Sequence, residues 1–568
     1  MRKWMAVIAL AALCASVAHA QGEDAALRKK VDAVFAAYDK PDSPGCALGV
    51  IQEGALTYIR GYGRANLEHS LPITSKTVFD IGSTSKQFTA ASILLLEQQG
   101  KLSLDDDIRK FVPELPDYGT KITIRYLVHH TSGLRDYLTL MSLAGVDFHG
   151  VTTDADALAI IARQKALNFA PGDEYLYSNS GYFLMAVIVQ RASGKSLREF
   201  AQEHIFGPLR MTSTHYHNDH AEVTPNRASA YEPKDGGGYR IDMSNFEQTG
   251  DGAVFTTVED LLKWDQNFYE PKVGGAALVQ ALLTRGRLNS GKELDYATGL
   301  MVRKHRGLTS VSHGGSWGGY RAELLRFPEQ RFSVATLCNV GSSDPSRLAR
   351  QVAELYLSSA MTPVARRATS AAGAGSETAQ GGAETTTAAQ LEKYAGVFRN
   401  AENGGLRRVS VRDGKLRIDS FGAASMELRA MGGDRFSVAD PPSATEIAFD
   451  PSRNALVVSR AGEPPEAERF ERAEAFAPSL AELSRYAGMY YSEELDVSYR
   501  LEMKDGKLWM RVLHDPAREL KPAVRDLFVG PFGVRLEFAR SNDAALQPRA
   551  GSFTVQAGRV RNIRFVRR

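Results

Sequence analysis

The sequence has few cysteines, little imbalance of charge and, after its first twenty residues, no apolar run long enough to span a membrane. Only three of its 568 residues are cysteine. Cys46 and Cys338 are the two outside the N-terminal stretch, and two cysteines do not suggest a structural zinc site. The sequence leaves open whether they pair in an oxidising compartment or stay apart as buried thiols, which is the simpler interpretation.

The charges nearly balance, with 69 Lys and Arg against 66 Asp and Glu. Nucleic acids and anionic membrane surfaces attract proteins with a strong basic excess, so we expect no nucleic-acid partner. Because no later apolar run could span a membrane, we also expect no stable membrane insertion. Hydrophobic residues make up 43% and charged residues 24%, as in soluble globular proteins. A chain of this length predicts two to four domains.

The N-terminus has the pattern of a secretory signal peptide. Arg2 and Lys3 precede an apolar stretch over 5–17, and Ala18 and Ala20 fit the small-residue pattern of a cleavage site. We therefore predict a signal peptide over 1–20 and a periplasmic or secreted protein.

A candidate nucleophile lies before an apolar helical run that ends at Gly100. Ser83 and Lys86 are three residues apart, which is one turn on the same helical face. Free N–H groups at a helix start stabilise developing negative charge. A serine hydroxyl becomes nucleophilic when a base removes its proton, and an amine of lowered pKa can do so. A Ser-x-x-Lys match also arises by chance in a chain of this length, but the helix behind it favours Ser83 as nucleophile and Lys86 as base.

A second motif follows a loop that opens at Pro171. Tyr177 and Asn179 are two residues apart, so in extended chain they point the same way. A phenol near an amine can act as acid or base, and an amide side chain can hold a substrate amide. Tyr216 and Asn218 match the same pattern, but no helix frames their polar stretch. We therefore prefer Tyr177 as catalytic and Asn179 as substrate-binding.

Three histidines, His215, His217 and His220, lie in that same polar stretch. Imidazoles bind transition metals, but surface histidines in a polar loop are the simpler interpretation. We predict no metal site.

The third motif is His313, Gly314, Gly315 and Ser316, at the end of a strand-like run. Glycines let a second backbone approach a strand edge closely, which predicts a substrate-binding segment. A glycine-rich hairpin is the alternative.

The order of elements over 24–358 is strands, then many helices, then strands. This predicts one α/β (α+β) domain over 21–365, with a mixed sheet built from both ends of the domain and helices on both faces. Residues 366–390 are rich in Ala, Gly, Ser and Thr and are predicted to be a flexible linker.

An internal repeat follows the linker. The Tyr-Ala-Gly at Tyr394 and the Asp-Gly-Lys-Leu at Asp413 both recur 92 residues later, at Tyr486 and Asp505. Asp-Gly between alternating runs is a hairpin signal. We predict two small antiparallel β-barrel domains without a catalytic constellation, over 391–478 and 479–568.

Taken in order, the motifs at Ser83, Tyr177 and His313 resemble the serine β-lactamase and penicillin-recognising hydrolase superfamily. The likeness is to its class C β-lactamase, D,D-carboxypeptidase, D-aminopeptidase and esterase branch, and it covers about residues 24–358. The resemblance implies that Ser83 is acylated, that Lys86 and Tyr177 handle protons and that Asn179 positions the substrate. It implies hydrolysis with no metal or organic cofactor.

The same resemblance implies an oxyanion hole made by the backbone N–H groups of Ser83 and Ser316. Many β-lactamases have Lys-Thr-Gly where this chain has His313, Gly314 and Gly315. A fixed cation for a substrate carboxylate is therefore missing, which argues against a strong β-lactamase.

The two barrels resemble the layout of D-aminopeptidases. We therefore expect a secreted serine hydrolase of D-amino-acid amides or short peptides. One alternative acts on β-lactams, peptidoglycan stem peptides or small esters, and another is a non-catalytic penicillin- or cell-wall-binding protein. By the same resemblance, the second barrel would lend a loop to the cleft, and residues 514–526 are the candidate because they break the strand pattern.

Overall fold

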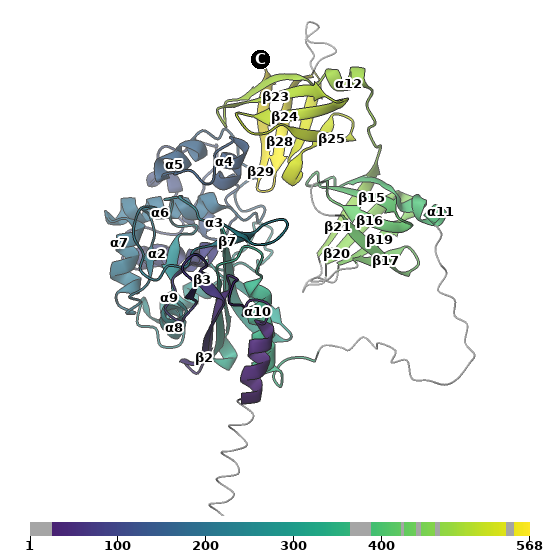
Figure 1. Cartoon of the computed structure of the whole chain (residues 1–568). Helices are drawn as coiled ribbons and strands as arrows, with labels where there is room; N and C mark the ends of the chain where they lie inside the picture. The colour runs from purple at the N-terminus through teal and green to yellow at the C-terminus, as the bar shows by residue number, and fades with distance from the viewer. Residues whose placement is uncertain (1–24, 364–387, 422–424, 439–444, 461–465, 541–549) are drawn as a thin grey trace, which may run out of the picture. The chain divides into compact units, whose positions relative to one another are not determined.

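The computed structural model describes residues 25–363, 388–421, 425–438, 445–460, 466–540 and 550–568 (Figure 1). The predicted signal peptide and residues 366–387 of the predicted linker lie outside these ranges, while residues 388–390 begin the short helix α11 (Ala388–Leu391). The chain divides into two compact units, of which the second comprises the segment Leu138–Val146 and the chain from 366 onward. No helix in the described ranges has the length and apolar character that a membrane span requires.

The first unit is built on a six-stranded sheet whose strands come from both ends of the predicted domain. The strand order is β10 (Met301–His305), β11 (Leu308–Trp317), β12 (Tyr320–Phe327), β13 (Phe332–Cys338), β1 (Cys46–Gln52), β2 (Ala55–Tyr62). All five neighbouring pairs of this sheet are antiparallel. A mixed sheet would also contain parallel pairs. Short connections join β1 to β2 and β10 through β13, so only the β1–β13 pair brings distant parts of the chain together.

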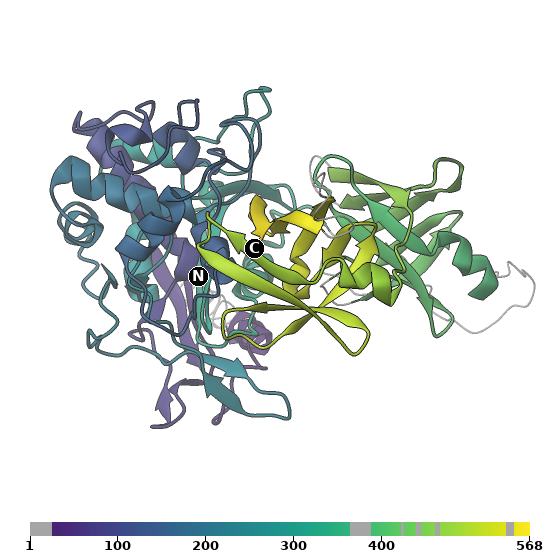
Figure 2. The same ribbon diagram turned by 90° about the horizontal axis from the view of Figure 1, so that it is seen from above.

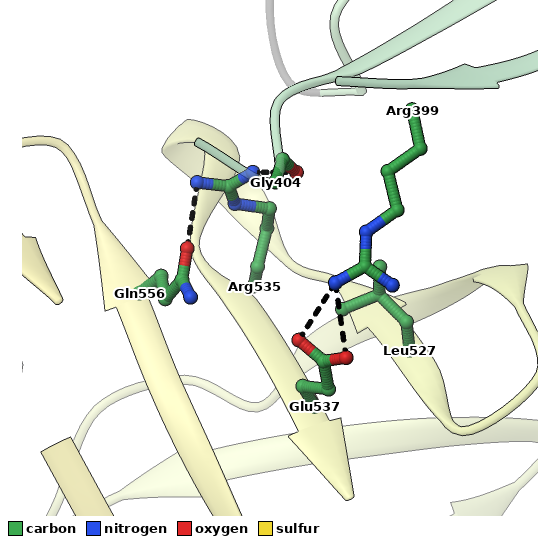
Figure 3. Close-up of a pocket in the computed structure, with 6 residues that line it drawn as sticks. All are labelled: Arg399, Gly404, Leu527, Arg535, Glu537 and Gln556. Atoms are coloured by element: carbon green, nitrogen blue, oxygen red, sulfur yellow. Dashed lines mark hydrogen bonds and ion pairs between the residues drawn. The ribbon is translucent and has the colours of Figure 1, made fainter. Parts of the chain in front are cut away.

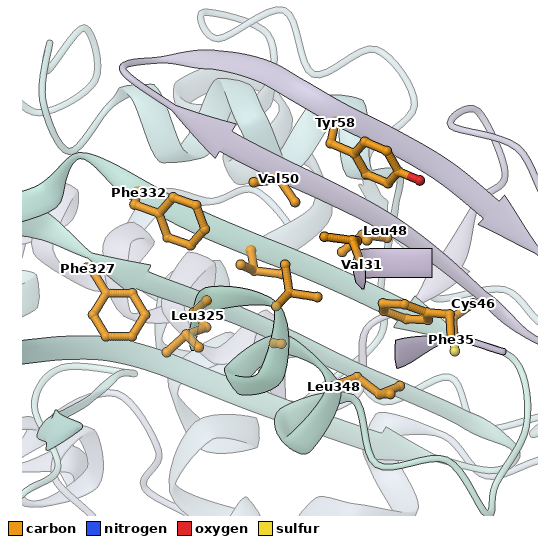
Figure 4. Packing of buried hydrophobic residues seen from close by; sticks show 14 of the residues in the cluster. Val31, Phe35, Cys46, Leu48, Val50, Tyr58, Leu325, Phe327, Phe332 and Leu348 are labelled. Carbon is orange, nitrogen blue, oxygen red and sulfur yellow. The ribbon is translucent and has the colours of Figure 1, made fainter. Parts of the chain in front are cut away.

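Helices cover both faces of this sheet, as predicted. Along β1, Cys46, Leu48 and Val50 face a core cluster that includes residues of the helix over 25–34 and of α10 (Pro345–Leu357) (Figure 4). Successive side chains of a strand point to opposite faces. On the other face α8 (Val258–Gln266) approaches so closely that a Cβ at Gly49 would lie 3.3 Å from the Cβ of Val258.

Cys46 and Cys338 lie directly opposite each other in the β1–β13 pair and form a disulfide. Of the two interpretations that the sequence left open, the structure has the bonded one. The bond joins residues 292 positions apart. It links β1 to β13, which are the first and last strands of this sheet in chain order and are neighbours within it.

The first part of the chain contains further helices and short strands. Its other helices are α2 (Lys86–Gln98), α3 (Ile124–Val128), α4 (Tyr137–Leu143), α5 (Asp154–Ala162), α6 (Asn179–Ser193), α7 (Leu197–Ala201) and α9 (Gly275–Leu283). Its short strands are β3 (Arg64–Asn66), β4 (Leu71–Pro72), β5 (Phe79–Asp80), β6 (His215–Tyr216), β7 (Tyr231–Pro233), β8 (Tyr239–Ile241) and β9 (Val254–Thr256). Strands β5, β9 and β6 form a small sheet in that order.

The second unit contains two closed antiparallel barrels, which confirms the predicted β-barrel fold (Figures 1 and 2). The first consists of β14 (Gly396–Arg399), β15 (Leu406–Arg412), β16 (Lys415–Asp419), β17 (Met426–Gly432), β18 (Arg435–Val438), β19 (Thr445–Asp450), β20 (Ala455–Arg460) and β21 (Glu466–Ala473). After α12 (Leu480–Ser484), the second consists of β22 (Gly488–Ser492), β23 (Val497–Lys504), β24 (Lys507–Val512), β25 (Arg518–Val524), β26 (Leu527–Val529), β27 (Arg535–Arg540), β28 (Ala550–Ala557) and β29 (Val560–Arg567).

The repeat in the sequence corresponds to the same hairpin in each barrel. Asp413 and Gly414 join β15 to β16 with φ of 52° and 70°, and Asp505 and Gly506 join β23 to β24 with φ of 51° and 73°. Two successive residues of positive φ make the tight turn that suits the twist of a hairpin, and Asp-Gly is a preferred pair for it.

A hydrogen bond is repeated as well. Tyr394 Oη donates to Asp434 Oδ1 at 2.5 Å, and Tyr486 Oη donates to Asp526 Oδ1 at 2.7 Å. Both partners are shifted by the same 92 residues as the sequence motifs. The repeat therefore preserves a tertiary contact as well as a local turn.

The expectation that residues 514–526 form a loop is wrong. Most of this segment is strand β25, which pairs with β24 and β26. Pro522 interrupted the strand pattern in the sequence, but it lies next to a register shift, where a missing N–H is tolerated. Ala523 and Val524 are buried in a cluster with Val397 and Leu406 of the first barrel.

Ionic contacts accompany that cluster between the barrels (Figure 3). Arg399 donates to both carboxylate oxygens of Glu537, at 3.0 and 3.1 Å. Arg535 donates to the Gly404 carbonyl and, at 2.9 Å, to the side chain of Gln556. Within the second unit, the barrels therefore share both an apolar and a charged contact.

Candidate active site

Ser83 lies in a single 3-10 turn, η1 (Gly82–Ser85), and Lys86 is the first residue of α2. The helix is buried from Lys86 to Leu96, which explains its apolar sequence. Gly82 has a φ of 48°, and a Cβ there would lie 2.6 Å from the backbone nitrogen of Ser316. A larger residue would be strained in that conformation and would clash. Glycine before the serine therefore lets the nucleophile's turn lie against the end of β11.

The Lys86 amine is fully buried and directed at three oxygen atoms. Its Nζ lies 3.0 Å from Ser83 Oγ, 3.0 Å from Asn179 Oδ1 and 2.5 Å from the Asp251 carbonyl oxygen. These contacts hold the amine between the turn of Ser83, the start of α6 and the segment at Asp251. They also bring together the first and second predicted motifs, which are 93 residues apart.

Asn179 is the first residue of α6, and its backbone N–H donates to Asp136 Oδ2 at 2.7 Å. A negative carboxylate at a helix N-terminus is favourable. Because Lys86 donates to Oδ1, the NH₂ group of the Asn179 amide is turned away from the amine. That orientation suits an amide that holds a substrate carbonyl.

The aromatic ring of Tyr177 lies beside the Lys86 amine. Lys86 Nζ lies 4.9 Å from the centre of its ring and 5.4 Å from that of Tyr182. His130 packs on the Tyr177 ring, with centroids 4.1 Å apart, and accepts a hydrogen bond from the Ser178 N–H at 3.1 Å. The structure makes it the residue that supports the Tyr177 ring and the loop beside it.

Tyr216, the competing match to the second motif, is not directed at Lys86. Its hydroxyl lies 2.7 Å from Thr89 Oγ1, one turn further along α2. Asn218 accepts instead from Arg198. Tyr177 and Asn179 thus lie at Lys86, whereas Tyr216 and Asn218 have other partners.

The third motif lies within β11 and not in a hairpin turn. β10 pairs only with Leu308–Ser312, so it does not cover the edge of β11 from His313 onward. Thr84 donates to the His313 carbonyl at 3.0 Å, and a Cβ at Gly315 would lie 1.8 Å from the Ile81 carbonyl oxygen. The glycine was expected to admit a substrate backbone. It is required, in addition, by the turn that bears Ser83.

His313 is neutral in the folded protein. Its Nδ1 lies 2.7 Å from the Gly314 carbonyl, which can only accept, so Nδ1 carries the proton. Its Nε2 then accepts from the Tyr296 hydroxyl at 3.1 Å. Burial, with a smaller contribution from the charge of Lys86, lowers the pKa of His313 from 6.5 to about 3. The third motif therefore supplies no positive charge to a substrate.

Two buried carboxyl groups near the site were not singled out from the sequence. Asp80 accepts from the Gly82 N–H at 2.8 Å, and burial raises its pKa to about 7. Burial also raises the pKa of Asp251, and the charge of Lys86 opposes that rise. Tyr137 donates to both carboxylate oxygens of Asp251, at 3.2 and 3.3 Å. No local pattern marks Asp251, because its partner Tyr137 comes from a distant part of the chain.

Groups of metal-ligand type converge at the loop that follows β6, where we predicted surface histidines. Within the described ranges, His215, His217 and Glu222 form one such group, and Asp219, His220 and Glu247 form another. The side chain of His217 is only 7% exposed, so the description as a surface histidine is wrong for this residue.

Known proteins share this fold and sequence. A family model described as Beta-lactamase matches residues 31–357. Penicillin-binding protein 4* of Bacillus subtilis is 30% identical over 333 residues, which are 55% of this chain and 72% of that protein. A D-aminopeptidase of Cereibacter sphaeroides is 26% identical over 525 residues, 91% of this chain and 92% of the relative.

Among solved structures, the octameric penicillin-binding protein homologue from Pyrococcus abyssi has a TM-score of 0.55 and 23% identity, covering 79% of this chain and 99% of that one. At that identity the likeness concerns the fold. The family match extends over more than half of the chain and contains all three motifs. The chain therefore belongs to the Beta-lactamase family and is a serine hydrolase of that superfamily.

Proposed function

We propose that this enzyme hydrolyses D-amino-acid amides or short peptides through an acyl-enzyme on Ser83. The observation that carries the proposal is the buried amine of Lys86, 3.0 Å from Ser83 Oγ, in a site whose third motif is uncharged. The similarity to a D-aminopeptidase over 91% of the chain supports the substrate class.

In the proposed reaction, Ser83 Oγ attacks the substrate carbonyl carbon while its proton moves to Lys86 Nζ. For this step the Lys86 amine must be in its neutral form, which has a lone pair that can take the proton. The new oxyanion is held by the backbone N–H groups of Ser83 and Ser316, which belong to two segments in close contact. The leaving amine takes a proton through Tyr177, and water then hydrolyses the ester on Ser83.

The polarity of the site indicates which substrates are preferred. A neutral His313 offers a hydrogen-bonded ring and no cation, so a substrate carboxylate gains no ion pair there. Uncharged amides and esters are therefore favoured over β-lactams and over peptides with a free D-Ala terminus.

An activity on β-lactams or peptidoglycan stem peptides is the second candidate. The similarity to penicillin-binding protein 4* favours it. It uses the same nucleophile and base and differs only in what the pocket recognises.

We also propose that the enzyme is exported to the periplasm or secreted. The basic and apolar pattern of residues 1–20 supports this location. The Cys46–Cys338 disulfide is consistent with it, because disulfides persist in oxidising compartments.

A panel of chromogenic substrates tests the proposed function. We expect turnover of D-alanine p-nitroanilide to exceed that of its L-isomer and of nitrocefin, with p-nitrophenyl acetate as a general measure of acylation. Efficient hydrolysis of nitrocefin with none of the D-amide would contradict the D-aminopeptidase proposal and favour the second candidate. No turnover and no adduct on Ser83 would contradict both.

A variant sharpens the same test. His313→Lys introduces the cation that many relatives have, so we expect the preference to shift toward substrates that carry a carboxylate. An unchanged preference would show that the third motif does not set the charge of the substrate.

A further inference from the structure

Two histidines are placed side by side by the strand β6 and the residue after it. β6 pairs with β9, and the His217 N–H continues the pairing by donating to the Ala253 carbonyl at 2.8 Å. Residues two apart on a strand share a face. His215 and His217 accordingly both pack beside the Phe255 ring, with centroids 5.8 and 4.4 Å away.

Glu222 completes a triangle with these imidazoles. His215 Nε2 lies 3.4 Å from His217 Nδ1, His217 Nδ1 lies 3.5 Å from Glu222 Oε2, and His215 Nε2 lies 3.9 Å from the same oxygen. Good hydrogen bonds between such atoms measure about 2.7–3.2 Å. The three groups therefore face one another at distances that direct hydrogen bonds do not explain well.

The same distances suit a shared metal ion. Zinc binds imidazole nitrogen and carboxylate oxygen at about 2.0–2.2 Å, so neighbouring ligand atoms of a tetrahedral site lie about 3.3–3.6 Å apart. Two edges of the triangle fall in this range, and the third exceeds it by a few tenths of an ångström. The side chains of His215 and Glu222 are 19% and 31% exposed, so an ion can reach the triangle and keep a water ligand.

The carboxylate is held in place by a second residue. Arg198 donates to Oε2 and Oε1 of Glu222, both at 2.6 Å. This bidentate contact fixes the orientation of the carboxylate, as partners of metal ligands do. A carboxylate oxygen has more than one lone pair and can serve both the guanidinium and an ion. The charge of Arg198 repels a dication, so we expect weaker binding than in a closed four-ligand site.

We propose that His215, His217 and Glu222 bind one divalent transition-metal ion of the zinc type. The ion would tie β6 to the loop at Glu222. Tyr216, between the two histidines, points to the opposite side and contacts Thr89 of α2. The site would thereby stabilise a strand that packs on the helix of Ser83 without taking part in the reaction.

The test uses the full chain without an affinity tag, stripped with a chelator and dialysed. Zinc binding is measured by competition with a chromogenic chelator, and stoichiometry by elemental analysis. We expect one zinc per chain and a rise in Tm on adding zinc. Cobalt should give the visible absorption of a tetrahedral complex. His215→Gln and His217→Gln should each weaken binding at least tenfold and abolish the rise in Tm.

His220→Gln is the matched control. It lies in the same loop, but its Nδ1 is 2.8 Å from Glu247 Oε1, a normal hydrogen-bond distance. We expect this variant to bind zinc like the unmodified chain. His215 is partly exposed, so His215→Gln can be tested even if His217→Gln does not fold. The proposal is overturned if the unmodified chain binds no zinc, if His215→Gln binds it equally well, or if His220→Gln is the variant that loses it.

Discussion

The interior of the hydrolase unit contains Lys86, Asp251 and Arg326, which are 0%, 8% and 1% exposed, whereas the interior of the second barrel is a cluster of rings. In that barrel Phe553 contacts Tyr490 and Phe538, with centroids 4.8 and 5.0 Å apart. Among the described residues of both barrels, the buried polar or charged ones are Asn400, Asp419, Ser492 and Glu494.

The difference follows from what each part has to do. Burying rings stabilises a fold by about 25 cal/mol per Å² of apolar surface, without any demand for exact partners. Burying an amine or a carboxylate costs free energy unless each polar atom is paired. The hydrolase unit buries such groups around Ser83, where a desolvated amine is chemically useful, and the described parts of the barrels bury fewer of them. The following predictions test this comparison.

The largest effect is expected for Ser83→Ala. Turnover should fall by at least about 10³-fold, because the variant loses the hydroxyl that lies 3.0 Å from Lys86 Nζ and is the proposed nucleophile. The Tm should change little, since the side chain is replaced by a smaller one in a turn. Mass spectrometry with a fluorophosphonate should show an adduct that the variant lacks. Ser92→Ala, on the same helix, is the control and should keep its activity.

Lys86→Arg should lower kcat by about 10²–10⁴-fold, because a guanidinium does not accept the Ser83 proton. Circular dichroism and Tm separate this loss from a failure to fold, and Lys86→Met provides a second, apolar variant. Exposed Lys110, which forms an ion pair with Asp106 at 2.9 Å, is the control, and Lys110→Arg should be neutral. Full activity in Lys86→Met would show that the buried amine is structural.

Asp265→Ala tests whether paired burial is what makes the polar interior tolerable. Asp265 Oδ1 accepts from Arg326 Nε at 2.6 Å and from Ser333 Oγ at 2.8 Å, with both charged side chains 1% exposed. Leaving the Arg326 guanidinium buried without this partner should cost about 3–5 kcal/mol in chemical denaturation. The surface pair Lys507–Glu519 of the second barrel is the contrast, and Glu519→Ala should cost at most about 1 kcal/mol.

The pH dependence of stability tests whether His313 is neutral in the folded chain. Its pKa is lowered from 6.5 to about 3, so between these values the unfolded chain binds a proton there that the folded chain does not. Stability must then fall as the pH falls through that window. Between pH 7 and pH 5 the unmodified chain should lose about 2 kcal/mol relative to His313→Gln.

Asp80 changes the pH dependence of stability in the opposite direction over a similar pH range. Its raised pKa lets the folded chain bind the proton more tightly, so its contribution to stability is lost as the pH rises. Because Asp80 is present in both proteins, the difference between their denaturation curves isolates His313. If the difference in unfolding free energy between the unmodified chain and His313→Gln is the same at pH 7 and pH 5, the His313 ring is not held neutral.

The smallest effect concerns the repeated hydrogen bond of the barrels. Tyr394→Phe and Tyr486→Phe each remove the hydroxyl that donates to an aspartate. Each substitution should lower the free energy of unfolding by about 1–2 kcal/mol. We expect similar losses, because the repeat places both tyrosines in the same way. Denaturation followed by near-ultraviolet circular dichroism measures them. A loss confined to one variant would mean that the two barrels no longer depend on the same contact.

Much of this structure was predictable from residues close together in the sequence. Ser83 and Lys86 were paired by helical spacing, and the Asp-Gly pairs predicted the hairpins at Asp413 and Asp505. The second motif was separated from its competitor at Tyr216 by the loop and helix around Tyr177. Segment 514–526 was misinterpreted because Pro522 and nearby charges break the local strand pattern, while its partners β24 and β26 compensate for the interruption.

By itself, the sequence determined the helix of Ser83, the turns and the presence of two barrels, because backbone preferences and side-chain periodicity act over a few residues. Only the tertiary structure decided that the Asp251 carbonyl orients Lys86, that His313 is neutral and that Cys46 meets Cys338. These features depend on atoms that come from distant segments and on the water that packing excludes. The separation of residues along the chain determines neither the contacts nor the exclusion of water, so these features follow from the fold alone.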